Sequence, residues 1–276
     1  MIISIQGGKG SFHHIATNKL FHSYELLERA TFEEVFQDVA EKRADFALVA
    51  IENSIAGSIT HNYNRLARYR IPIVAEVYLR ISHQLIAFPG VRLEDLREIW
   101  SHPMAIEQCR DFLNKQRAKI IEKEDTAGSV QLIKEKRLTH VGAIASSLAS
   151  EIYDMPILNQ AIETDPNNYT RFLLLSYQSY TQKPLSDSLK TTLHFGVKHK
   201  SGSLVDVLFI MKDAGINMTK IESRPQLGKP WEYDFIVDVD GDMNQEQYKY
   251  AMQAVRENCT FVEVFGCYKS IDVDAV

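Results

Sequence analysis

The feature that most constrains the fold is a regular alternation of short apolar segments with amphipathic helical patterns, which runs from the N-terminus to about residue 160. Residues 2–6 and 46–51 have the length and composition of buried strands. A helix is expected after Thr31, because acidic residues suit the first turn and the apolar side chains share one face, at Phe32, Val35, Phe36 and Val39. Such alternation predicts an α/β architecture.

Capping residues mark further elements of this first part. Ser101 is expected to be the N-cap of a helix with Pro103 in its first turn, and Asp125 is expected to cap another. Ser101 and Gln108 would then share one helix face, because they are about two turns apart. The other expected elements are strands at 71–76, 83–88 and 141–145 and helices that begin near residues 12 and 146.

The composition shifts at residues 176–188, which are rich in Ser, Gln, Thr and Tyr and indicate a linker or domain edge. Beyond it, strands are expected at 191–198, 217–223, 231–239 and 262–268, with helices at 204–213 and 245–257. This βαββαβ order is the ferredoxin-like pattern. We therefore expect one domain at residues 1–180 and a smaller one at 190–276.

Composition excludes several classes of protein. The 276 residues carry a formal net charge of −5, which gives no reason to expect a nucleic-acid partner. Neither a signal peptide nor a membrane-spanning segment is expected, and the three cysteines lack CxxC spacing, so a cytoplasmic protein with free thiols is the simplest interpretation. The histidines form no compact ligand set, and the glycine-rich run 7–11 lacks phosphate-loop spacing. We expect no metal and no cofactor.

Polar side chains follow two of the apolar segments. Glu52-Asn53-Ser54 comes directly after 46–51, and Thr170-Arg171-Phe172 stands at the head of the apolar run 173–175. In open α/β sheets, sites form where strands end. Together with the run 216–225, these segments resemble the prephenate dehydratase family over nearly the whole chain.

The resemblance implies a fold and a reaction. The first domain is expected to form two α/β lobes around a cleft, like a periplasmic binding protein, and the second to be an ACT domain, a module that binds amino acids. The expected enzyme is a carbon–oxygen lyase of the single-activity form, which converts prephenate to phenylpyruvate, carbon dioxide and water in phenylalanine biosynthesis. Arogenate as the substrate, or a non-catalytic amino-acid sensor, remain the alternatives.

The resemblance also assigns roles to residues. Thr170 is expected to hydrogen-bond the leaving hydroxyl, and Asn53 and Ser54 to donate to substrate oxygens. Arg171 either clamps a substrate carboxylate or pairs with a structural acid such as Glu52. Glu52 is either a buried general acid or an ionised residue that fixes the loop. The remaining expected cleft residues are Phe172, Ser101, Gln108 and Thr126.

Two further runs predict regulation by phenylalanine. Gly202-Ser203-Leu204-Val205 and Glu222-Ser223-Arg224-Pro225 match the ACT-domain elements that shape the phenylalanine site in this family, and Asn217 is placed to reach the ligand's polar end. Ser203 stands where the family has alanine. We expect phenylalanine to bind between paired ACT domains of a homodimer or homotetramer, although a plain turn and dimer contact is the blander interpretation.

Overall fold

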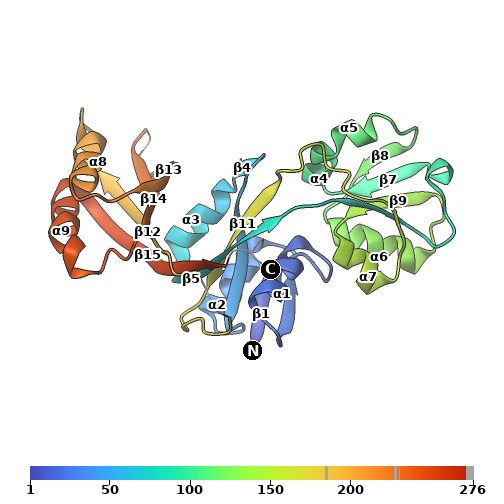
Figure 1. Ribbon diagram of the computed structural model, residues 1–276, viewed down its shortest axis with the longest axis horizontal. Coiled ribbons are helices and arrows are strands. Elements are labelled where there is room, and N and C mark those ends of the chain that lie inside the picture. The colour runs from blue at the N-terminus through green and yellow to red at the C-terminus, as the bar shows by residue number, and fades with distance from the viewer. Residues whose placement is uncertain (184–185, 227–228, 230, 272–276) are drawn as a thin grey trace.

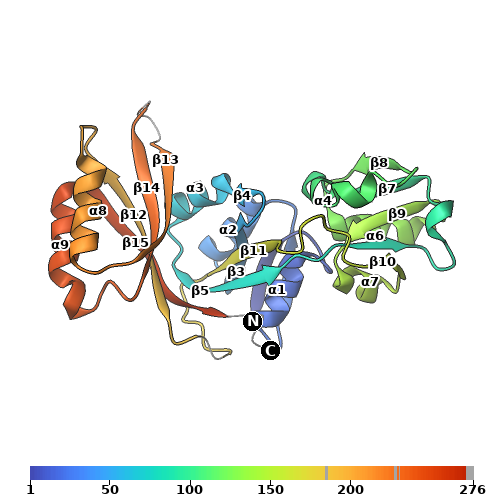
Figure 2. The same cartoon turned by 45° about the horizontal axis from the view of Figure 1, so that its top comes forward.

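The computed structural model describes residues 1–183, 186–226, 229 and 231–271. The chain forms a first lobe (residues 1–80 and 169–183), a second lobe (84–159) and a C-terminal domain (189–271), and the first lobe lies between the other two (Figures 1 and 2). Within the described residues, no helix is long and apolar enough to cross a membrane.

The first lobe has helices on both faces of its sheet. Its elements are β1 (Ile2–Gln6), α1 (Phe12–Leu20), β2 (Glu25–Arg29), α2 (Phe32–Ala40), β3 (Phe46–Asn53), β4 (Gly57–Ser58), α3 (Thr60–Tyr69), β5 (Ile73–Arg80) and β11 (Tyr169–Leu175). Thr31 closes a capping box with Glu34, as its sequence predicts. Strand β11 returns from the second lobe and lies antiparallel between β3 and β5. One core cluster lies on each face of this sheet.

The second lobe is built on a separate five-stranded sheet, in the order β10-β6-β9-β7-β8. Its elements are β6 (Gln84–Ala87), η1 (Leu93–Asp95), β7 (Glu98–Ser101), α4 (Pro103–Gln108), α5 (Arg110–Leu113), β8 (Lys119–Glu122), α6 (Thr126–Lys136), β9 (Val141–Ala145), α7 (Ser147–Tyr153) and β10 (Ile157–Asn159). The chain crosses between the lobes twice, through residues 81–83 and 160–168. The expected two-lobed architecture is confirmed.

The C-terminal domain has the expected βαββαβ order. It consists of β12 (Leu189–Val197), α8 (Ser203–Asp213), β13 (Met218–Pro225), β14 (Tyr233–Asp240), η2 (Glu246–Tyr248), α9 (Lys249–Asn258) and β15 (Cys259–Ile271), with sheet order β13-β14-β12-β15. Residues 184 and 185 of the expected linker, and 272–276 of the expected domain, lie outside the described residues.

The long strand β15 joins this domain to the first lobe. Its first part pairs with β12, and its end, Lys269 to Ile271, pairs in parallel with β5. One sheet therefore runs from β13 at its edge in the C-terminal domain to β2 in the first lobe. Phe265 and Tyr268 of β15 share a core cluster with Tyr63 and Leu173 of the first lobe. The C-terminal domain and the first lobe thus share both a sheet and a core cluster.

The expectation for Ser101 was wrong. Ser101 is the last residue of β7, and its hydroxyl donates to the carbonyl oxygen of Ile144 at 2.7 Å. His102 is the N-cap instead, and its Nδ1 accepts from the backbone N–H of Met104, while Pro103 occupies the first turn as expected. Ser101 and Gln108 do not share a helix face, because α4 begins only at Pro103.

Candidate active site

A cavity of about 470 Å³ lies between the two lobes. The first lobe contributes the loop after β1, the start of α1, and the facing ends of β3 and β11, while the second lobe contributes the starts of α4 and α6. Five residues expected at the site line it together: Asn53, Gln108, Thr126, Thr170 and Phe172. The cavity is therefore the place where the sequence-predicted polar residues converge.

Thr170 and Asn53 face each other across paired strands at the cavity wall. The two residues are register partners in β11 and β3, and Asn53 Nδ2 donates to Thr170 Oγ1 at 3.0 Å. Because that oxygen already accepts from Asn53, the hydroxyl proton of Thr170 is left to donate to a ligand. We refer to Thr170 and Asn53 below as the hydroxyl–amide pair.

A β-bulge in β3 gives Asn53 this orientation. Leu48 and Ala50 belong to the core on the cavity side of the sheet, whereas Val49 and Ile51 belong to the core on the other side. Strict alternation would turn Glu52 toward the cavity. The register with β11 shifts at this point, so that Ile51 is the extra residue and Asn53 points into the cavity instead.

The hydroxyl–amide pair ends a chain of hydrogen bonds that links the two lobes. His83 Nε2 lies 2.8 Å from Gln108 Oε1, and because an amide oxygen can only accept, the imidazole N–H is the donor. Gln108 Nε2 in turn donates to Asn53 Oδ1 at 3.5 Å. Each donor in this chain points toward Thr170, an arrangement in which successive bonds polarise one another in the same direction.

Asn53 also stabilises the hairpin formed by the end of β3 and β4, which lines this end of the cavity. Its Oδ1 accepts from the backbone N–H groups of Ile55 and Ala56, at 3.0 and 2.9 Å. Ser54, which was expected to bind the ligand, supports this hairpin: its hydroxyl donates to the Asn167 carbonyl oxygen and accepts from the Tyr169 N–H, both at 2.9 Å. The structure thus gives Ser54 backbone partners, and Ser54 is absent from the cavity lining.

The N-terminus of α6 lies on the opposite wall. Thr126 is the first residue of this 11-residue helix, and Asp125 caps it by accepting from Gly128 N. Oriented N–H groups at a helix start favour anions. Gly7 of the first lobe lies close to this helix start, since an added Cβ there would lie 3.5 Å from the Asp125 carboxylate. Glu124 and Asp125 also line the cavity, so negative charge stands next to the helix start.

Two buried histidines that the sequence did not single out also line the cavity. His13 packs edge-on against Phe172, with ring centroids 5.0 Å apart, and burial lowers its pKa to about 3. Burial likewise lowers the pKa of His83, despite the opposing effects of Gln108 and Glu163. Both imidazoles are therefore neutral near pH 7. The only sequence signal for His13 is its position just after the glycine-rich loop.

Arg171 does not reach the cavity. The side chain lies on the other face of β11, where Nε is 2.7 Å from Glu76 and Nη1 is 2.5 Å from Asp238. Burial alone disfavours the charged guanidinium, but Tyr268, Asp238 and Glu76 outweigh it and hold the pKa of Arg171 well above its ordinary value. Of the two expectations, the structure supports pairing with structural acids, although the acids are not Glu52.

Glu52 also points away from the cavity. Its carboxylate lies 2.9 Å from Lys220 Nζ of β13, in the C-terminal domain. This arrangement fits a residue that fixes the loop and not a general acid, because the carboxylate binds Lys220 and does not line the cavity. The bulge at Ile51 is the physical reason that Asn53, and not Glu52, points into the cavity.

A sequence profile described as prephenate dehydratase matches residues 3–180, the two lobes that form this cavity. The chain belongs to the prephenate dehydratase family. Arogenate dehydratase/prephenate dehydratase 1, chloroplastic, from Arabidopsis thaliana is 36% identical, over 96% of this chain and 71% of that protein. Membership in this family makes the chain a dehydratase.

Two solved structures share the fold of nearly the whole chain, and one of them is a prephenate dehydratase. The prephenate dehydratase of Arthrobacter aurescens in complex with L-Phe is 26% identical and superimposes with a TM-score of 0.87, over 98% of this chain and 90% of that chain. A protein described as a novel type of quorum-quenching acylase, GqqA, is 30% identical with a TM-score of 0.88, over 98% of both chains. The family fold therefore extends through the C-terminal domain.

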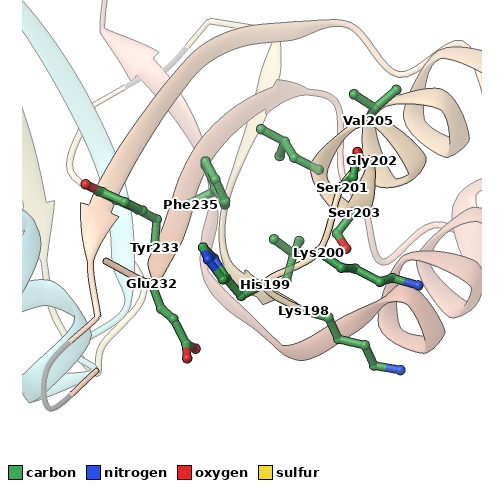
Figure 3. Close-up of a pocket in the computed structure, with 12 residues that line it drawn as sticks. Lys198, His199, Lys200, Ser201, Gly202, Ser203, Val205, Glu232, Tyr233 and Phe235 are labelled. Carbon is green, nitrogen blue, oxygen red and sulfur yellow. The ribbon is translucent and has the colours of Figure 1, made fainter. Parts of the chain in front are cut away.

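A second cavity, of about 420 Å³, lies in the C-terminal domain of this dehydratase (Figure 3). The four expected residues Gly202 to Val205 line it at the start of α8. Residues 198–200, which the sequence analysis did not single out, line it as well. Residues 198–202 form the loop between β12 and α8. In Figure 3 the ring of His199 extends from this loop toward Tyr233, whereas the side chains of Lys198 and Lys200 extend away from β14.

The other residues expected at a phenylalanine site lie outside this second cavity. Asn217 Nδ2 donates to Asp240 Oδ2 at 2.6 Å. Glu222 accepts from the Ser58 hydroxyl at 2.8 Å, and Arg224 Nη2 donates to Asn64 at 2.7 Å, so both side chains are directed at the first lobe. Ser223 and Pro225 are exposed on the opposite face of β13. Within one chain, the two matched runs therefore do not form one pocket.

Proposed function

We propose that this dehydratase converts prephenate to phenylpyruvate, with release of carbon dioxide and water. The observation that carries the proposal is the Thr170 hydroxyl, which accepts from Asn53 at 3.0 Å and so presents its own proton to the cavity. A donor aimed at an oxygen that gains negative charge in the transition state lowers the barrier.

The proposed reaction needs no covalent bond between the protein and the substrate. The bond between the ring and its carboxylate breaks, and its electron pair enters the ring. The ring hydroxyl then departs with its own bonding pair, so that the ring becomes aromatic. Thr170 donates a hydrogen bond to this departing oxygen, which takes up one proton from solvent to form water. Because an alcohol is a weak acid, Thr170 acts by polarisation and not by full proton transfer.

Neutral groups and backbone N–H donors are proposed to hold the substrate. The start of α6 at Thr126 is the anion-binding element, and Gln108 and Asn53 supply amide groups. His13 and His83 remain uncharged because they are buried. Phe172 forms an apolar part of the wall against which the ring can pack.

Arogenate is the second candidate substrate, and a specific feature favours it. Glu124 and Asp125 both line the cavity. Arogenate carries an ammonium group where prephenate carries a keto group, and a carboxylate near that group would attract the ammonium. Dehydration of arogenate gives phenylalanine directly, and in either case the product serves phenylalanine biosynthesis.

We also propose that the C-terminal domain is an ACT domain that pairs with a second copy and binds phenylalanine there. Val205, Phe209 and Ile221 are 50%, 53% and 45% exposed, which leaves an apolar surface on α8 and the edge strand β13. Pairing of copies would bring the exposed side chains of Ser223 and Pro225 near a second chain's Gly202 to Val205. Binding of L-Phe by the similar Arthrobacter enzyme supports phenylalanine as the ligand.

We place the enzyme in a reducing compartment, the cytoplasm. Cys109, Cys259 and Cys267 are all free, and burial raises the pKa of Cys259 to about 11, so this thiol stays protonated and unreactive. Imaging of a fluorescently tagged chain in its source cell tests this assignment, and a signal confined to another compartment would refute it.

Product analysis tests the proposed reaction. Purified protein is incubated separately with prephenate and with arogenate, each with and without phenylalanine at millimolar excess, and products are separated by chromatography. Phenylpyruvate from prephenate, with a rate that phenylalanine lowers, is the expected result. Phenylalanine formed mainly from arogenate would reassign the substrate, and no product from either would refute catalysis at this cavity. Sedimentation of the same samples tests pairing, since a monomer would refute it.

A further inference from the structure

The residues directly behind the hydroxyl–amide pair are both anchored by the C-terminal domain. Arg171 follows Thr170 in β11, Glu52 precedes Asn53 in β3, and Arg171 and Glu52 are themselves register partners. Thr170 and Asn53 face the cavity, whereas the side chains behind them bind Asp238 and Lys220. In each of these two adjacent strands, a residue that faces the cavity is thus followed or preceded directly by a residue that contacts the C-terminal domain.

The contact behind Thr170 is a buried ionic cluster. Arg171 is 5% exposed, and its guanidinium is shared between Glu76 of β5 and Asp238 of β14. Asp238 is fixed in turn by the Thr192 hydroxyl at 2.6 Å, and Arg171 Nη2 donates to the Tyr268 hydroxyl at 2.9 Å. A guanidinium held by several fixed partners has little freedom to move, so the strand that carries Thr170 is fixed from behind.

The contact behind Asn53 is smaller and less buried. Lys220 Nζ lies 2.9 Å from Glu52 Oε1 and also donates to the Ser58 hydroxyl at 3.2 Å. The Ser58 hydroxyl donates to Glu222 at 2.8 Å, and Ser58 lines the cavity. Both ends of the hairpin that Asn53 supports are therefore tied to neighbouring side chains of β13.

We propose that the C-terminal domain positions the hydroxyl–amide pair, with Asp238 acting through Arg171 on Thr170 and Lys220 acting through Glu52 on Asn53. Lys220, Asp238, Glu52 and Arg171 are positioning residues, because none of them lines the cavity. Charged pairs of this kind add little net stability, so their value lies in the geometry that they fix. The proposal rests on the dehydration proposed above.

The proposal predicts a specific kinetic signature. The Thr170 hydroxyl contacts a group whose charge develops only in the transition state, so a displaced pair weakens transition-state binding more than substrate binding. A displacement of about 1 Å costs about a hundredfold in rate. Loss of Lys220 should therefore lower kcat and leave KM nearly unchanged.

Substitution of Lys220 in the full-length protein tests the proposal. Lys220→Met keeps most of the stem but removes the ammonium group, which binds Glu52 and lies 5.6 Å from the centroid of the Tyr63 ring. Lys220→Arg keeps the charge. Lys249→Met is the matched control, because Lys249 is an exposed lysine of the same domain that pairs with Glu246 within that domain. Each variant is assayed with prephenate and arogenate at a temperature at which circular dichroism shows it to be folded.

The expected result is a tenfold to hundredfold lower kcat for Lys220→Met, with KM within about twofold of the wild type. Lys220→Arg and Lys249→Met should keep at least half of the wild-type kcat. A wild-type kcat for Lys220→Met, or an equal loss in Lys249→Met, would overturn the proposal. Glu52→Gln, which removes the other half of the pair, should reproduce the loss, and provides the decisive variant if Lys220→Met does not fold. A wild-type protein that dehydrates neither substrate would refute the proposed function instead.

Discussion

Thr170 and Arg171 are neighbours in β11, yet their side chains serve opposite faces of the sheet. The Thr170 hydroxyl accepts from Asn53 at the cavity wall. On the other face, the Arg171 guanidinium binds Glu76 of the first lobe and Asp238 of the C-terminal domain. This separation follows from the alternation of side chains along a strand. Substitutions at the two positions should consequently have different effects: at Thr170 mainly on the chemistry, and at Arg171 on stability as well as on the position of Thr170.

Thr170→Val should lower kcat by about a hundredfold to a thousandfold, because it removes the donor that we propose for the leaving oxygen. Stability should change by no more than about 1 kcal/mol, because Asn53 Nδ2 keeps its acceptors on Asn168 and Tyr169. Initial rates of product formation measure the effect. Thr170→Ser keeps the hydroxyl and should retain most of the activity, while full turnover by Thr170→Val would remove Thr170 from the reaction.

Arg171→Met should destabilise the protein by about 3–5 kcal/mol, because it leaves Asp238 buried without its cation and Glu76 with Lys190 as its remaining cation. The free energy of unfolding is measured by urea titration. Arg68→Met is the control: its side chain is 69% exposed and pairs with Glu33, so the expected loss is about 0–1 kcal/mol. Equal losses for the two variants would contradict the buried network.

Local rules predicted most of the elements and the strand ends at which the cavity forms. Thr31 and Asp125 cap helices as expected, since a capping motif is read from a few adjacent residues. The nearness of Thr170 and Asn53 also followed from polar residues at strand ends. Such features depend on residues that are close together in the chain, so they can be predicted from the sequence.

The side of the sheet on which each residue lies was less predictable. The bulge at Ile51 breaks the alternation along β3. It could not be predicted, because the apolar run 46–51 contains no Gly, Pro or Asn that would indicate a bulge. Ser101 was misplaced because its short strand β7 offers only Ile99 and Trp100 as apolar residues. The contact between Glu52 and Lys220 joins residues 168 positions apart, a pairing that only the packing of whole domains determines.

Gly10→Ala should hold the two lobes apart. Gly10 has φ +84°, and an added Cβ would lie 2.8 Å from the Ala149 backbone of the second lobe, where the Ser146 hydroxyl also donates to the Gly10 carbonyl oxygen. Because the cavity lies between the lobes, we expect a KM at least about fivefold higher in addition to a loss of about 1 kcal/mol from the backbone strain.

Gly90→Ala is the matched control for this effect. Gly90 has the same φ of +84°, but an added Cβ would meet nothing within 4 Å. This variant should therefore show the strain alone, as a lower melting temperature with an unchanged KM. If both variants show the same KM, the approach of Gly10 to Ala149 has no part in ligand binding.

Burial of His13 should make stability depend on pH. Its pKa is lowered from 6.5 to about 3 in the folded protein, so the unfolded chain binds an extra proton between these values. The stability contributed by neutral His13 is present above pH 6.5 and is lost as the pH falls toward 3. His13 alone should cost about 1 kcal/mol of unfolding free energy between pH 6 and pH 5. His13→Gln, which does not titrate, should show a pH profile that is shallower by this amount in urea titrations. Parallel profiles for the two proteins would show that His13 has an ordinary pKa, and would remove the argument that the cavity wall is uncharged at this position.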